Sequence, residues 1–154
     1  DGVLRYSRDG IAFLDRKGEE RWNQSYQIKT PLIDVNDEAA AVADKGGNDI
    51  VVVDRQGLKG EIHTTLPIEK ISVSEQGIVS ALVKNDSGPS IMTYDAMGNI
   101  LAEVKTSFSG TGYPLDIGIS KDGKTLLVSY MSVQNGKTDT NIVYYYFDEA
   151  KKED

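Results

Sequence analysis

The chain contains no cysteine and only one histidine among its 154 residues. The lack of cysteine excludes disulfide bonds, zinc sites built on thiolates and a cysteine nucleophile. The single imidazole, His63, lies in a segment expected to form an outer strand over Glu61–Leu66, where it alternates with Glu61 and Thr65. We therefore expect His63 to be a surface residue rather than a metal ligand or a catalyst.

The sequence also lacks the motifs of common cofactor and metal sites. It has no G-x-x-x-x-G-K-[ST] phosphate loop, no G-x-G-x-x-G fingerprint and no G-x-S-x-G nucleophile elbow. The segment Asp34–Glu38 offers oxygen ligands in a turn, but it lacks the D-x-D-x-D-G pattern of a calcium loop. We therefore predict no cofactor, no metal site and no catalytic residue, and we expect the chain not to be an enzyme.

Basic charge and long apolar runs are scarce as well. The chain has 17 Lys and Arg against 24 Asp and Glu, a net charge of −7, which disfavours a nucleic-acid partner. No run approaches the roughly 20 apolar residues that span a bilayer. Since Asp1 begins within the pattern and no apolar leader precedes it, we expect a mature or excised part of a longer protein.

What the sequence does contain is a repeat. Three segments of mostly apolar residues each end in D-x-x-G, and their Asp residues are 39 and then 41 residues apart. A period near 40 residues is typical of four-stranded propeller blades. Asp can cap a tight turn and Gly can adopt positive φ, so these residues are predicted to be structural, not catalytic. The predicted turn residues, with a fourth pair further along, are Asp15, Gly18, Asp54, Gly57, Asp95, Gly98, Asp122 and Gly123.

A second recurring unit opens each predicted blade. In Pro114–Tyr130 the apolar residues alternate up to Ile119, a Ser-Lys-Asp-Gly turn follows, and a β-branched and apolar strand begins. Weaker copies occur at Leu32–Ala43 and Ile71–Val83. The unit resembles the first half of a blade in WD40-like and TolB-like propellers, although alone it would also suit a hairpin in a β-sandwich.

These units predict an all-β fold of consecutive four-stranded antiparallel blades, forming a partial propeller arc of about 3.5 blades. One domain covers residues 1–147, and a charged tail covers 148–154. The predicted parts are a partial blade at 3–26, complete blades at 31–66 and 70–105, and a partial blade at 115–147. We expect the last blade to hold strands at Thr125–Ser132 and Asn141–Phe147. An open arc has exposed edges at both ends, which can pair with another chain, and the aromatic run Tyr144–Phe147 needs a cover on one face.

Trp22 is the only tryptophan. The spacing from Asp15 to Trp22, D-x-x-G-x-x-x-W, resembles the blade motif of quinoprotein-type propellers, in which the ring docks between blades. Counting along the other repeats places Glu61 and Ala102 at this position, so the resemblance does not extend to a quinone cofactor. We expect Trp22 to pack between blades; the alternative is an aromatic residue of a binding surface.

Most of the chain resembles a propeller-like domain family of unknown function from Gram-positive Firmicutes. The resemblance rests on three stretches: Arg5–Gly10, Pro67–Lys70 and Gly112–Tyr130. It implies a cell-surface, extracytoplasmic domain that belongs to a longer protein and follows a membrane anchor outside this chain. It implies no activity.

The resulting hypothesis is a non-enzymatic interaction or scaffold module with a protein partner. The alternative is a carbohydrate- or small-ligand-binding domain, because aromatic rings stack on sugars and Tyr26, Tyr113 and Tyr130 are expected near blade rims. A third hypothesis, a hydrolase that uses carboxylates of a central channel such as Asp116, has no second acid paired with it in the sequence.

Overall fold

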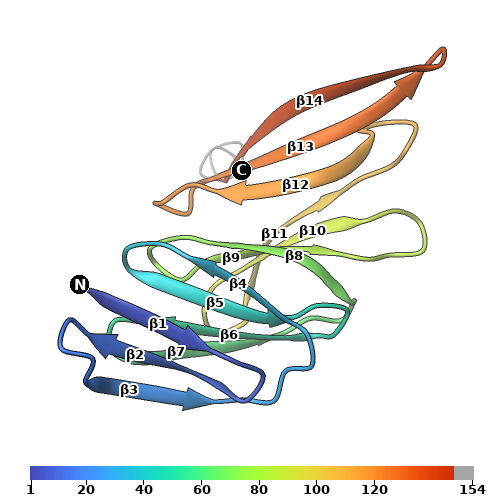
Figure 1. The fold of residues 1–154 in the computed structure, drawn as a ribbon. Helices are drawn as coiled ribbons and strands as arrows, with labels where there is room; N and C mark the ends of the chain where they lie inside the picture. Colours follow the sequence, from blue (N-terminus) through green and yellow to red (C-terminus); the bar gives the residue numbers. More distant parts are fainter. Residues whose placement is uncertain (148–154) are drawn as a thin grey trace.

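A computed structural model of the protein describes residues 1–147, so the predicted tail lies outside the described residues. The described part consists of fourteen strands and the turns between them, in four antiparallel sheets of three or four strands. Figure 1 shows the sheets stacked in chain order, with the first (blue) and the fourth (orange to red) at opposite ends. The all-β fold with consecutive blade-like sheets is confirmed.

Each sheet is a meander of neighbouring strands. The first sheet contains β1 (Gly2–Tyr6), β2 (Gly10–Asp15) and β3 (Glu20–Ser25). The second contains β4 (Pro31–Val35), β5 (Ala39–Asp44), β6 (Asp49–Asp54) and β7 (Gly57–His63). The third contains β8 (Ile68–Val73), β9 (Val79–Val83), β10 (Ser90–Tyr94) and β11 (Ile100–Lys105). The fourth contains β12 (Tyr113–Ile119), β13 (Thr125–Gln134) and β14 (Lys137–Tyr146).

The incomplete sheets lack opposite strands. In the complete second sheet, the turn residue Asp54 ends the third strand and pairs with Ala39 in the second strand. In the first sheet, the turn residue Asp15 ends β2 and pairs with Gly2 in β1. Strands β1 and β2 therefore correspond to the second and third strands of a complete sheet. Within residues 1–147, the first sheet therefore has no innermost strand, and the fourth sheet, which ends at β14, has no outermost strand. Both ends of the described arc are open.

Three apolar clusters, one between each pair of successive sheets, hold the stack together. The run Ala39–Ala43 in β5 is buried on both faces, since its odd-numbered residues face the third sheet and its even-numbered residues face the first. Strand β6 is also buried on both faces, with Ile50 and Val52 facing the third sheet and Val51 and Val53 facing the first. Continuous apolar runs are what strands buried on both faces require, and the small alanines let the sheets approach.

Side-chain hydrogen bonds to the backbone link the innermost strands. The carboxylate Oδ2 of Asp34 in β4 accepts a hydrogen bond of 2.8 Å from the Val73 N–H in β8. One sheet further on, the hydroxyl Oγ of Ser72 accepts one of 2.9 Å from the Ile119 N–H in β12. The two acceptors occupy the same position in the repeat, directly after Ile33 and Ile71. The same contact therefore joins the second sheet to the third and the third to the fourth.

The predicted turn residues form the expected turns. Asp15 Oδ1 accepts hydrogen bonds of 2.9 Å from the backbone N–H groups of Lys17 and Glu19, and Gly18 has a φ of 80°. Asp95 repeats both bonds, whereas Asp54 accepts only one, from the Gln56 N–H. Asp122 caps its own turn through Lys124, and Gly57, Gly98 and Gly123 also have positive φ.

The last hairpin is longer than the sequence analysis predicted. Strands expected at Thr125–Ser132 and Asn141–Phe147 extend instead to Gln134 and back to Lys137. The turn between them is Asn135-Gly136, with φ values of 52° and 76°. Two successive positive φ angles make a two-residue hairpin turn whose twist suits the flanking strands. The prediction was wrong here because the polar segment Lys137–Asn141 has no apolar alternation.

The outermost strand of the second sheet also begins earlier than predicted. It covers Gly57–His63 rather than Glu61–Leu66, because Gly57 pairs directly with Asp54 across a tight turn.

Candidate functional site

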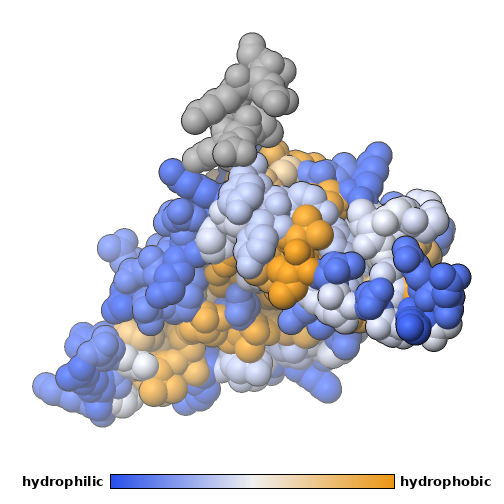
Figure 2. Space-filling model, turned by 90° about the horizontal axis from the view of Figure 1, so that it is seen from above, coloured by the Kyte–Doolittle hydropathy of each residue, from blue (hydrophilic) through white to orange (hydrophobic). Residues whose placement is uncertain are grey.

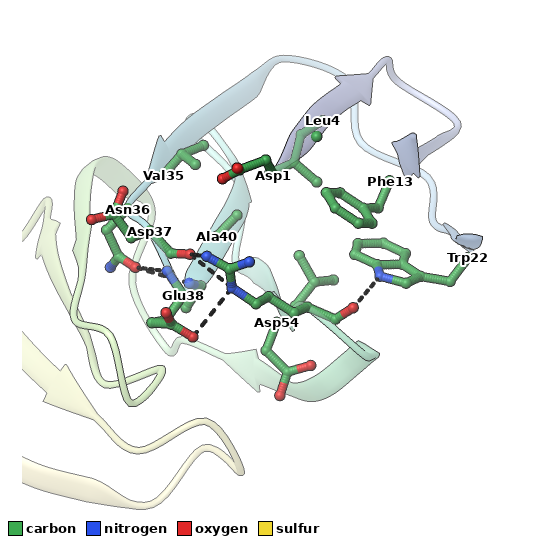
Figure 3. Close-up of a pocket in the computed structure, with 14 residues that line it drawn as sticks. Asp1, Leu4, Phe13, Trp22, Val35, Asn36, Asp37, Glu38, Ala40 and Asp54 are labelled. Carbon is green, nitrogen blue, oxygen red and sulfur yellow. Dashed lines mark hydrogen bonds and ion pairs between the residues drawn. The ribbon is translucent and has the colours of Figure 1, made fainter. Parts of the chain in front are cut away.

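A cleft of about 460 Å³ lies between the first and second sheets. It runs along the rim where the β4–β5 and β6–β7 turns meet the strands of the first sheet (Figure 3). Its walls combine the aromatic rings of Phe13 and Trp22 with the polar turn Asn36–Glu38. The other lining residues are Asp1, Gly2, Leu4, Val35, Ala39, Ala40, Val53, Asp54 and Arg55.

Trp22 joins the two sheets at one end of the cleft. Its indole Nε1–H donates a hydrogen bond of 3.0 Å to the Arg55 carbonyl oxygen in the second sheet. On its own sheet the ring stacks on Phe13, with ring centroids 6.1 Å apart. The predicted packing of Trp22 between blades is confirmed, and its indole N–H is satisfied by the neighbouring blade.

The residue equivalent to Trp22 in the second sheet is Gly60, not Glu61. Trp22 pairs with Phe13, two residues before the turn Asp, and the residue that pairs with Val52 at the same position is Gly60. Counting along the sequence gave Glu61 because the turn after Asp54 is shorter than the turn after Asp15. Gly60 lies against the backbone of Ala96 in the third sheet. Ala96 is the counterpart of Arg55, since each follows the turn Asp of its sheet. The same backbone position is therefore contacted by the preceding sheet at both junctions, by Trp22 at Arg55 and by Gly60 at Ala96.

The Arg55 side chain, which lines the cleft, binds the β4–β5 turn. Its Nε and Nη2 donate hydrogen bonds of 3.1 and 2.8 Å to the Asp37 carbonyl oxygen, and Nε lies 3.3 Å from Glu38 Oε2. These contacts tie the β6–β7 turn, which holds Arg55, to the β4–β5 turn, which holds Asp37 and Glu38. The pair with Glu38 is about half exposed on both sides, so its contribution to stability is small.

A second candidate surface is the open face of the fourth sheet. Cross-strand pairing places Leu127 opposite Tyr144, and Ser129 opposite Ile142, on the face turned away from the third sheet. Ile142 is 58% exposed and Tyr144 is 54% exposed. Figure 2, which looks down on this end of the stack, shows apolar and pale side chains together in the centre, with hydrophilic ones around them. The open-face residues, which we call the fourth-sheet face, are Leu127, Met131, Val133, Ile142, Tyr144 and Tyr146.

The three tyrosines singled out in the sequence do not come together. Tyr130 was expected near a rim, but its side chain is 1% exposed and lies in the cluster between the third and fourth sheets. Its hydroxyl is 2.7 Å from the hydroxyl of Tyr145, and burial raises the pKa of Tyr130. This ring cannot stack on a ligand, because Tyr130 points to the same face as Leu126 and Val128.

The other two tyrosines lie at separate junctions. Tyr26 is partly buried against the cluster between the first and second sheets, and burial raises the pKa of its hydroxyl. Tyr113 is exposed at the start of β12 and stacks on the exposed Phe108, with centroids 5.6 Å apart. Of the three predicted residues, only Tyr113 presents an accessible aromatic surface.

The remaining polar candidates are single surface groups. His63 Nδ1 lies 2.8 Å from Asp49 Oδ1 on an exposed edge. Asp116 is exposed, with Lys70 Nζ at 3.7 Å. Within residues 1–147, no cluster of three or more histidine and acidic side chains is arranged to share a metal ion. The same residues include no helix of sufficient length and apolarity to cross a membrane.

A family profile matches the chain over its whole length, residues 1–154, and the family is described as one of unknown function (DUF5711). The chain belongs to this family. No curated protein matches this DUF5711 chain.

Solved structures similar to the DUF5711 chain are β-propellers. The Pan2 WD40 domain of Neurospora crassa is 12% identical, with a TM-score of 0.56 over 96% of this chain and 46% of that one. BamB from Moraxella catarrhalis is 17% identical, with a TM-score of 0.57 over 84% and 40%. KlAtg21, in a complex with the coiled coil of AgAtg16, is 13% identical, with a TM-score of 0.58 over 88% and 48%. The chain thus spans less than half the length of each, and at these identities the likeness shows the fold alone.

Proposed function

We propose that this chain is a non-enzymatic interaction module of a propeller-type protein, acting on the extracytoplasmic side of a Gram-positive cell surface. The observation that carries the proposal is the fourth-sheet face, an apolar sheet surface with exposed Ile142 and Tyr144. Contiguous exposed apolar surface marks sites of protein association. The WD40-like fold supports this proposal, and KlAtg21 is an example of a similar propeller in complex with a protein.

The edge strand β14 adds a second means of association. It is ten residues long and pairs only with β13, so one row of its backbone N–H and C=O groups has no partner among the described strands. Such an edge is a template for another strand. A partner that packs on the fourth-sheet face can therefore also pair with this edge.

The direct test is capture of a partner from an envelope extract by immobilised wild-type chain and by Ile142→Glu. A specific partner is expected to bind the wild type saturably and to bind Ile142→Glu at least about tenfold more weakly, because a charge must be buried unpaired. Val3→Glu, a change of the same kind on the open face of the first sheet, is the matched control and should retain the partner. Capture that is equal for all three proteins counts against the proposal.

The proposed location is tested separately. A tagged full-length protein on intact cells should be degraded by added protease if this domain faces outward. Complete protection in intact cells, with degradation after lysis, would place the domain inside the cell and contradict the proposed location.

A second candidate function is binding of a carbohydrate at the cell surface. The specific observation in its favour is the exposed stack of Phe108 on Tyr113, since flat aromatic surfaces accept sugar rings. Binding on a glycan array that Tyr113→Ala abolishes would support this function, and a silent array with the wild type would eliminate it. Glycosidase activity lost in Asp116→Asn would instead contradict the non-enzymatic proposal.

A further inference from the structure

In the described part of the chain, the links between innermost strands leave one backbone donor without an acceptor. Val73 and Ile119 each donate their backbone N–H to a side chain of the preceding sheet, Asp34 or Ser72. Their equivalent in the second sheet is Val35, which follows Asp34 in the same position of the repeat. Among the strands that the structure describes, the first sheet has no innermost strand to provide an acceptor. Val35 is 50% exposed and lines the cleft.

Strand alternation shows where the Val35 N–H points. In an antiparallel ladder, successive residues turn their N–H groups alternately toward the partner strand and away from it. Asn36 donates to Ala39 within the second sheet, over 2.9 Å, so the preceding residue, Val35, points its N–H to the free edge of β4. Ser74 and Ser120 make the corresponding bonds in their sheets, and there the free-edge amides carry the observed links.

The free edge of β1 faces the same space. Ser7 donates to Gly10 within the first sheet over 2.9 Å, so by the same alternation Tyr6, Leu4 and Gly2 direct their backbone groups to the free edge. Gly2 and Leu4 line the cleft together with Val35. Backbone groups at the free edges of β1 and β4 are therefore directed into the same cleft, between the first and second sheets.

Register fixes which residue an added strand would place near Val35. In the second sheet Asp34 pairs with Ala41, which pairs with Val52, two residues before the turn Asp. In the third sheet Ser72 pairs with Ser80, which pairs with Thr93 at the same position. In the first sheet that position is Phe13, and its partner in β1 is Leu4. The residue opposite Leu4 thus corresponds to Asp34 and Ser72.

We propose that the free edge of β1 is a binding site for one extended strand, supplied from outside residues 1–147 and antiparallel to β1. Its pattern is an apolar residue, then Asp or Ser, then Val or Ile, then Asn or Ser. The second residue lies opposite Leu4 and accepts the Val35 N–H. The pattern is the one shared by Ile33–Asn36 and Ile71–Ser74, whose last residues cap the following turn. The added strand completes the first sheet as a four-stranded blade.

The test uses two labelled synthetic peptides and the 154-residue chain. One peptide has the sequence of residues 29–36 of this protein, and the other has Ala in place of its Asp. The first peptide should bind saturably by fluorescence anisotropy, and the second about tenfold more weakly, because a hydrogen bond to a charged acceptor is lost. Amide hydrogen exchange should show new protection at Leu4, Tyr6 and Val35 when the first peptide is bound.

Two protein variants locate the site. Tyr6→Pro removes a free-edge N–H while keeping the β1–β2 ladder bonds, since proline is tolerated on edge strands, and it should weaken peptide binding at least about tenfold. Ile142→Glu alters the fourth-sheet face and should bind the peptide like the wild type, so this proposal and the proposed function can fail independently. If circular dichroism shows that Tyr6→Pro does not fold, the difference between the two peptides in binding to the wild type still tests the proposal.

Several results would overturn the proposal. These are no saturable binding, equal binding of the two peptides, and new protection on β14 instead of β1. A fourth is protection of Leu4 and Tyr6 that rises with protein concentration without any peptide, which would mean that a second copy of the chain occupies the edge.

Discussion

Gly60 occupies the position at which the second sheet touches the backbone of the third. A Cβ atom at this residue would lie 2.7 Å from the Ala96 carbonyl carbon and would overlap the carbonyl oxygen. We predict that Gly60→Ala lowers the free energy of unfolding by about 2–3 kcal/mol, because backbone in a packed junction must move. Urea denaturation followed by circular dichroism measures the loss.

The matched control is Gly118→Ala in β12, where an added Cβ meets nothing within 4 Å. This change should leave stability equal or raise it by roughly 0.5 kcal/mol, since alanine restricts the unfolded chain more than glycine does. Equal effects of the two substitutions would contradict close packing at Gly60.

The turn carboxylates make stability depend on acid pH. Hydrogen bonding from Asn99, first from its side chain and then from its backbone, lowers the pKa of Asp95 below its ordinary value of 3.8. The unfolded chain therefore takes up a proton before the folded chain does. The stability that Asp95 contributes is complete above that ordinary pKa and is lost as pH falls through the folded pKa. The pKa values of Asp15 and Asp122 are lowered in the same sense.

We therefore predict that Asp95→Asn lowers the melting temperature near neutral pH and makes its fall toward about pH 2.5 shallower than in the wild type. Thermal unfolding across this pH range measures both effects. Asp139→Asn removes the same charge from an exposed position of β14 and should keep the wild-type acid transition. A variant profile parallel to the wild type would show that Asp95 does not contribute in this way.

At the scale of elements, the hairpin of β13 and β14 depends on its two-residue turn. Gly136 has a φ of 76°, which a β-carbon disfavours by roughly 1–2 kcal/mol. Gly136→Ala should therefore destabilise the tip of the hairpin, and amide exchange should quicken at Lys137–Thr140 more than at Ile142–Tyr145. Asn135→Gly allows the same backbone conformation and should leave amide exchange in the hairpin unchanged. Uniform loss of protection along β14 would contradict a local effect.

The same elements show what the sequence could and could not predict. The capped turns at Asp15, Asp54 and Asp95 recur with nearly constant spacing, so a local rule was enough to predict the blades. The end of β13 was missed because only the Asn135-Gly136 dipeptide signals it. Tyr130 was misplaced although its parity with Leu126 and Val128 indicated the buried face.

The cleft could not be predicted, because it depends on contacts between distant residues. Trp22 and Arg55 are 33 residues apart and are joined by a side chain and a backbone carbonyl, which carries no sequence signature. Likewise, the acceptors Asp34 and Ser72 appear in the sequence as ordinary polar strand residues. Their common role becomes visible only when the sheets are stacked.

At the scale of the whole molecule, the two open faces differ in character. The open face of the first sheet carries a charged pair, with Arg5 Nη2 3.7 Å from Glu20 Oε2. The fourth-sheet face is mainly apolar, and the one acidic side chain beside it among the described residues is Asp116 of β12, opposite Ser129. Packing the first-sheet face of one chain on the fourth-sheet face of another would desolvate the charged pair against an apolar sheet. Two fourth-sheet faces therefore match each other better. The isolated chain is therefore expected to pair through two fourth-sheet faces related by a twofold axis.

Light scattering after size exclusion, over a dilution series, tests this expectation. The wild type should change from a dimer toward a monomer of 16.9 kDa as it is diluted, because one sheet face buries only a modest area. Ile142→Lys should be monomeric at every concentration, and Val3→Lys should behave like the wild type. If both variants abolish the dimer, the arcs instead join end to end, with the fourth sheet of each packed on the first sheet of the other. A wild type that is monomeric throughout would mean that the fourth-sheet face pairs only with a different protein.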